Sequence, residues 1–154
     1  MAVYYADSSV LVKRHVVESG TSWVQQLTEP AAGNRIITAH ITQVEGISAL
    51  SRRLREGTLA LAQYTPIADD WVMLCVTQYQ IVALTAAIVD ASRRLLEAHP
   101  LRAYDAVQLA TAVLSNQALV AAGHSPLTFL AADRRLLDTA TAEGLAVDDP
   151  SQYP

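Results

Sequence analysis

The sequence predicts an α/β fold in which a mostly parallel sheet of four to five strands is flanked by helices. Short apolar, β-branched or aromatic segments alternate with segments of helical spacing along the whole chain. Hydrophobic residues make up 51% of the 154 residues and charged residues 17%, so a sizeable core is expected. Glycine and proline number six each and are scattered, which leaves no visible linker. We therefore expect a single domain over residues 1–154.

Strand and helix signals alternate twice in the first half of the chain. The strand VYYA runs into Asp7-Ser8-Ser9, residue types that commonly cap helices. Further along, Gly57 is expected to end the amphipathic helix at 42–56. The turn at Gly33-Asn34 separates a helix from the next strand. The elements expected here are a strand at 3–6, a helix at 10–16, a helix at 21–29, a strand at 35–39 and a helix at 42–56.

The second half continues the alternation. Residues 58–79 have mostly helical character, and we expect a break near Pro66, with Asp69 or Asp70 starting a new turn. His99-Pro100 separates two further helices, and Gly144 ends the last one. The remaining expected elements are a strand at 80–85, a helix at 86–98, a helix at 101–120, a strand at 126–133, a helix at 134–143 and a strand at 145–149.

One carboxylate lies where a buried helix face is expected. Asp105 falls in LRAYDAVQLATA, and residues four apart share a helix face, so Leu101, Asp105 and Leu109 form one stripe. We interpret Asp105 as facing a polar cleft at the edge of the sheet.

Three other acids have comparable positions. Asp7 and Asp133 each end a predicted strand that runs into a helix, and Glu45 lies near the start of a helix. Each alone is more simply a helix cap or a partner of the helix dipole, but ligands of such sheets gather at the carboxyl ends of the strands. Two carboxylates about 4 Å apart repel by roughly 4 kcal/mol at an effective dielectric of 20, so a cluster needs protons or cations. An all-oxygen cluster suits Mg²⁺.

The contexts of these four acids, YYADSSVLVKRHV, QVEGISAL, LRAYDAVQLATA and FLAADRRLLDTA, closely resemble the PIN domain, and specifically the VapC toxins of bacterial toxin–antitoxin pairs. The resemblance implies a PIN-like three-layer sandwich and a metal-dependent endoribonuclease. It matches the family's acidic residues, both as catalytic groups and as ligands of one or two Mg²⁺ or Mn²⁺ ions, to Asp7, Glu45, Asp105 and Asp133. It also implies an RNA substrate, a VapB-like antitoxin and a homodimer. One departure is Gln108, where a histidine is common in the family.

Three further residues are candidate substrate contacts, each beside a simpler alternative. Ser8 could touch a phosphate or a metal-bound water, or cap the helix. Lys13 could contact phosphate or be an exposed helix charge, and Arg102 could clamp phosphate or pair locally with Asp105. The pair Arg52-Arg53 is most simply a solvated helix face.

Charge and hydropathy restrict the function classes. The net charge of −4 and a pI near 5.4 are not typical of a protein that holds nucleic acid by a broad basic surface, although two Mg²⁺ ions would place positive charge at the cleft. No apolar run approaches the ~18 residues of a membrane helix, and no signal peptide is visible, so we expect a cytoplasmic protein without membrane contact.

Two rival functions remain open. A Mg²⁺-dependent phosphatase would also use Asp7, but its commonest signature needs a second aspartate where this chain has Ser9. A noncatalytic PIN-like module that binds RNA or protein would keep the acids without turnover. The lone Cys75 lies in WVMLCV and is predicted to be a buried hydrophobic residue.

Overall fold

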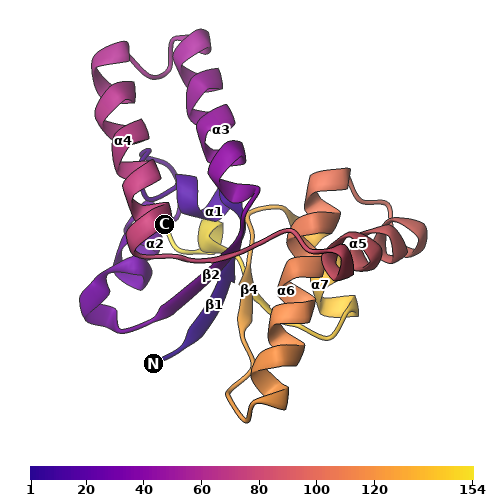
Figure 1. Ribbon diagram of the computed structural model, residues 1–154. Helices are drawn as coiled ribbons and strands as arrows, with labels where there is room; N and C mark the ends of the chain where they lie inside the picture. Colours follow the sequence, from indigo (N-terminus) through magenta and orange to yellow (C-terminus); the bar gives the residue numbers. More distant parts are fainter.

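The computed structural model describes residues 1–154 and shows five parallel strands between two layers of helices (Figure 1). The strand order is β3-β2-β1-β4-β5, and all four neighbouring pairs are parallel. The α/β fold class expected from the sequence is thereby confirmed. The strands are β1 (Val3–Ala6), β2 (Arg35–Ala39), β3 (Gln80–Val82), β4 (Thr128–Leu130) and β5 (Ala146–Asp148).

The two faces of the sheet carry separate apolar clusters, because successive strand residues point to opposite faces. Tyr5 and Phe129 face helices α5, α6 and α7, whereas Ala6 and Leu130 face helices α1 to α4. The α-helices are α1 (Ser8–Val12), α2 (Thr21–Thr28), α3 (Thr42–Glu56), α4 (Leu61–Thr77), α5 (Ala86–Ala98), α6 (Ala103–Ala121) and α7 (Arg134–Ala142), with 3₁₀ turns at Pro30–Ala32 and Pro150–Gln152.

The order of the strands creates a crevice beside β1. The chain runs from β1 to β2 and β3 on one side, and then crosses to β4 and β5 on the other. In open parallel sheets, such a reversal leaves a crevice at the carboxyl ends of the strands, where ligands bind. The Asp7 N–H donates to the Leu130 carbonyl at 3.2 Å, so the exit of β1 is held directly against the end of β4.

Helices α3 and α4 form an antiparallel pair that projects beyond the sheet (Figure 1). The fully buried Trp71 of α4 packs on Gly46 of α3 and donates its indole N–H to the Gln43 carbonyl at 3.1 Å. A Cβ on Gly46 would lie 1.9 Å from the Trp71 ring. Glycine is therefore required at this position for α4 to approach the start of α3.

Three local predictions are wrong. The helix expected at 10–16 is α1, which ends at Val12. Helix α4 continues through Pro66 without a break, because Ala62, whose carbonyl loses its N–H partner at the proline, is exposed to water. Strand β4 ends at Leu130, so Asp133 does not end the strand; it lies three residues later and caps α7.

The prediction for Cys75 holds. Cys75 is buried, and burial raises the pKa of its thiol to about 11, which suits a packing residue. None of the helices combines the length and the apolar character needed to cross a bilayer.

Candidate active site

Asp7 is buried at the exit of β1 and caps α1. Its side chain is 5% exposed, and Oδ1 accepts hydrogen bonds from the Ser9 hydroxyl at 2.6 Å and the Val10 N–H at 3.1 Å. Burial raises the pKa of Asp7 to about 7; these two hydrogen bonds oppose the rise, and the charges of Glu45 and Asp105 add to it. Asp7 is thus a carboxylate with neutral donors and acidic neighbours.

Glu45 lies in the first turn of α3 and is held by a buried amide. Gln108 of α6 is 1% exposed, and its Nε2 donates to Glu45 Oε1 at 2.6 Å and to the Thr42 hydroxyl at 2.9 Å. Its Oε1 accepts from the Tyr5 hydroxyl at 2.6 Å, so the whole amide is engaged. Burial raises the pKa of Glu45, and Asp105 adds to the rise, whereas Gln108, Ser8 and Arg102 lower it.

Asp105 and Asp133 lie on the more open side of the site and share one arginine. The Arg102 guanidinium contacts Asp105 Oδ2 at 3.2 Å and Asp133 Oδ2 at 3.8 Å. Asp133 Oδ1 caps α7, accepting from the N–H groups of Arg135 and Leu136. The expected local pairing of Arg102 is present, and Asp133 differs from the other three acids because it is largely committed to its cap.

The structure therefore brings three of the four acids within electrostatic reach of one another. The charges of Glu45 and Asp105 raise the pKa of Asp7, and the charge of Asp105 also raises the pKa of Glu45, whereas Asp133 contributes to neither shift. As the side chains stand, no group of three His, Cys, Asp or Glu residues is arranged to hold a metal ion.

The donor chemistry nevertheless fits a hard divalent cation. The donors are carboxylate oxygens, which Mg²⁺ and Mn²⁺ prefer, and such ions keep several waters and use few protein ligands. Asp7 is the strongest argument, since a buried carboxylate with neutral donors and two acidic neighbours lacks the positive charge that would stabilise its ionised form.

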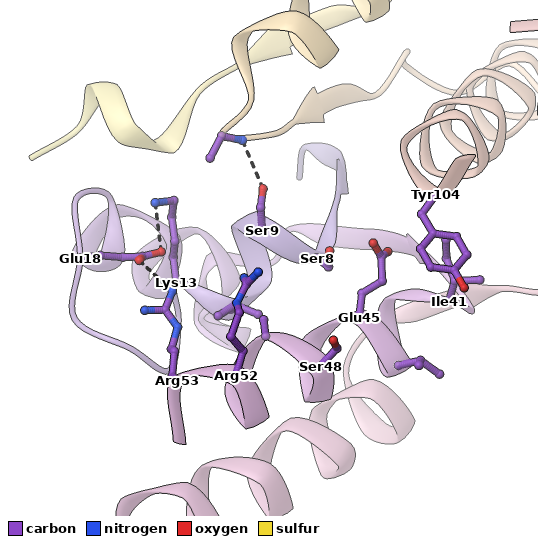
Figure 2. A pocket seen from close by; sticks show the side chains of 14 residues that line it. Ser8, Ser9, Lys13, Glu18, Ile41, Glu45, Ser48, Arg52, Arg53 and Tyr104 are labelled. Atoms are coloured by element: carbon purple, nitrogen blue, oxygen red, sulfur yellow. Dashed lines mark hydrogen bonds and ion pairs between the residues drawn. The ribbon is translucent and has the colours of Figure 1, made fainter. Parts of the chain in front are cut away.

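A cavity of about 620 Å³ opens beside these acids, between α1 and α3 (Figure 2). Ser8 and Glu45 line it near the acids, and Tyr104 lies at one end. Lys13 lines the far part, where its buried ammonium donates to Glu18 Oε1 at 3.1 Å and to the Ser19 carbonyl at 3.0 Å. These contacts leave Lys13 little free charge to offer a substrate.

Sequence reasoning did not assign several of the site's residues. Gln108 was noted as a departure from the family, one turn beyond Asp105, but its role was not assigned, because its three partners come from other elements. No sequence pattern marked Tyr104 or Ser48 as part of a site. Arg52 was interpreted as part of a solvated helix face, although it lines the cavity. Lining residues depend on how α3, α6 and β1 meet, which local spacing does not specify.

The fold and the site together define an α/β protein with an acidic cleft at the carboxyl ends of its parallel strands. More specifically, the chain belongs to the PIN domain family, whose sequence model matches residues 4–142.

Individual relatives agree with this membership. The chain is 29% identical over 147 residues to "Ribonuclease VapC45" of Mycobacterium tuberculosis, covering 96% of this chain and 95% of the relative. Among solved structures, it is similar to PAE2754 from Pyrobaculum aerophilum, with a TM-score of 0.63, 18% identity and coverage of 98% and 85% of the two chains. A chain of a toxin–antitoxin complex from Klebsiella pneumoniae gives a TM-score of 0.61 with 16% identity, covering 96% and 97%.

Proposed function

We propose that this protein is a Mg²⁺- or Mn²⁺-dependent endoribonuclease of the VapC toxin type, which hydrolyses RNA phosphodiester bonds. The observation that supports it best is the buried Asp7 carboxylate, which faces Glu45 and Asp105 at the carboxyl edge of the sheet. Membership of the PIN domain family and the similarity to a relative named as a ribonuclease support the choice of reaction.

The four acids would together coordinate one or two ions. Asp7, Glu45 and Asp105 would supply the main ligands, and Asp133 would join them from the open side. A bound ion would lower the pKa of water to give a nucleophile at neutral pH and would stabilise charge on the phosphate oxygens.

The surrounding residues orient these acids. Gln108 fixes Glu45 Oε1, and the Ser9 hydroxyl fixes Asp7 Oδ1. Arg102 contacts Asp105 and Asp133, and its exposed guanidinium is available to bind a phosphate when RNA enters. Ser8 lies beside Glu45 on the cavity wall, where its hydroxyl could contact a phosphate or water.

We further propose a VapB-like antitoxin as partner, a homodimer as the assembly and the cytoplasm as the location. The solved toxin–antitoxin complex and the VapC relative support the first, and the dimer follows from family resemblance. Light scattering that shows a monomer across micromolar concentrations would contradict the dimer.

Cleavage of a pooled RNA library tests the activity. Purified protein in Mg²⁺ or Mn²⁺ should produce cuts that disappear with EDTA and in Asp105→Asn, which preserves shape while removing charge. Asp90→Asn is the matched control, because Asp90 is an exposed helix acid that pairs only with Arg93 at 3.6 Å. It should cleave like the unmodified protein.

Thermal unfolding provides a reading that does not depend on activity. Because ions bind only the folded site, added Mg²⁺ or Mn²⁺ should raise the unfolding temperature of the unmodified protein and of Asp90→Asn, and raise it less in Asp105→Asn. Normal cleavage by Asp105→Asn would refute the mechanism. Ion binding without cleavage of any RNA would favour the alternative, a noncatalytic PIN-like module that binds RNA or protein.

A further inference from the structure

One face of α3 connects the acidic site with the basic end of the cavity. Glu45, Ser48 and Arg52 are three and four residues apart, so they share a helix face, and all three line the cavity (Figure 2). Seven residues separate Glu45 from Arg52, which corresponds to about 10 Å along the helix axis. Arg52 is therefore on the path of any strand that leaves the acids along this helix.

The other two cations of this region are already paired. Glu18 accepts from Lys13 through Oε1 and from Arg53 through Oε2, both at 3.1 Å. Arg52 forms no ion pair in the structure and is exposed to water inside the cavity. It is thus the one uncompensated positive charge among the residues that line the cavity.

The distance along α3 between Glu45 and Arg52 indicates which phosphate of a bound strand Arg52 would contact. Successive charges of one stacked nucleic-acid strand lie about 3.4 Å apart along the axis. A side chain that starts about 10 Å from Glu45 along the helix suits a phosphate further along the same strand than the one held at the acids. An arginine is also the side chain best matched to phosphate, because its planar donors can bind two oxygens together.

We propose that Arg52 forms a phosphate-binding subsite that holds the RNA backbone one or more nucleotides away from the reacting bond. The inference rests on the proposed ribonuclease function and adds the direction in which the strand runs, from the acids along α3 towards Arg52. Because this phosphate does not change during the reaction, the contact stabilises bound substrate and transition state equally.

Arg52→Gln tests the subsite, and Arg55→Gln is its matched control. Arg55 is an exposed arginine of the same helix that lies outside the cavity, so both variants lose the same charge from α3. Binding of a fluorescent single-stranded RNA is measured by anisotropy in Mg²⁺ at several salt concentrations, with Asp105→Asn present in every protein to prevent cleavage. Cleavage kinetics are measured in the same variants without Asp105→Asn.

Arg52→Gln should weaken RNA binding roughly three- to tenfold and reduce the slope of log affinity against log salt by about 0.7, the value for one phosphate contact on a single strand. It should raise KM with little change in kcat. Arg55→Gln should leave the affinity, the slope and KM close to those of the unmodified protein. Unfolding temperatures of both variants should match, since both residues are exposed.

Two results would overturn the subsite. Equal affinities of the two variants and the unmodified protein would show that Arg52 does not contact RNA, and equal losses in both variants would show only a general effect of charge. The proposed function fails separately: a preparation that binds RNA with the predicted contrast but cuts no RNA would refute the nuclease and keep the subsite.

Discussion

Replacing Gln108 with methionine should destabilise the protein through the groups that it leaves without partners. The side chain is 1% exposed and uses both ends of its amide: Oε1 accepts from Tyr5, and Nε2 donates to Thr42 and Glu45. This orientation follows from the contacts, because the opposite one would place Oε1 against the Glu45 carboxylate. Methionine has a similar shape, so little cavity is created.

The magnitude follows from the partners. The Tyr5 hydroxyl is fully buried, and burial raises the pKa of Tyr5 well above its usual value, so the hydroxyl keeps its proton and needs an acceptor. An orphaned buried donor costs about 1–3 kcal/mol, whereas Thr42 keeps its bond to Thr38 at 2.7 Å. Gln108→Met should therefore lower the free energy of unfolding by about 2 kcal/mol.

A double-mutant cycle with Tyr5→Phe isolates the contribution. Removing both partners leaves no unpaired group at this contact. The double variant should therefore lose about 1 kcal/mol or more less free energy of unfolding than the two single variants lose together. Urea unfolding followed by circular dichroism gives the values. Gln117→Met, at an exposed position of the same helix, controls for the exchange of residue type and should change stability by less than about 0.5 kcal/mol.

Additive losses in the cycle would refute the reasoning. They would mean that Tyr5 finds another acceptor once Gln108 is gone, and that the buried amide does not hold the two elements together.

Three further results are expected. Asp7→Asn keeps the cap but removes a carboxylate whose pKa rises from 3.8 to about 7 on folding. This raised pKa means that the folded state binds the proton more tightly, so the unmodified protein loses up to about 4 kcal/mol of stability as pH rises from about 4 through 7. In metal-free buffer, the variant should then unfold at higher temperature than the unmodified protein at pH 8 and match it near pH 4; a difference independent of pH would contradict this. Gly46→Ala should lower stability by more than about 1 kcal/mol in urea unfolding, because its Cβ would meet the Trp71 ring at 1.9 Å, and unchanged stability would show that α4 can shift. Arg102→Ala should strengthen Mg²⁺ binding in titration calorimetry, since it removes a cation from beside Asp105 and Asp133; weaker binding would instead show that Arg102 is needed to hold the two carboxylates in place.

The alternation of strands and helices was enough to predict the fold class, because each segment's period reflects the face that it buries. The predicted break at Pro66 was wrong, since a proline costs a helix least where the freed carbonyl meets water, and exposure is a tertiary property. The site was predictable only as a set of acids at element ends. The contact of Arg102 with Asp133 and the hydrogen bond of Gln108 to Glu45 join elements distant in sequence.

The order of the strands also determines when during synthesis this site can exist. Strand β1 pairs with β4, and the Ser9 hydroxyl accepts from the Ala132 N–H across 123 positions of sequence. A contact of that span cannot form until most of the polypeptide has left the ribosome, because long-range pairing waits for the late strand. The nascent chain therefore emerges with the exit of β1, which carries Asp7, separated from the end of β4 that precedes Asp133, and the proposed nuclease site cannot be complete before Asp133 has left the ribosome.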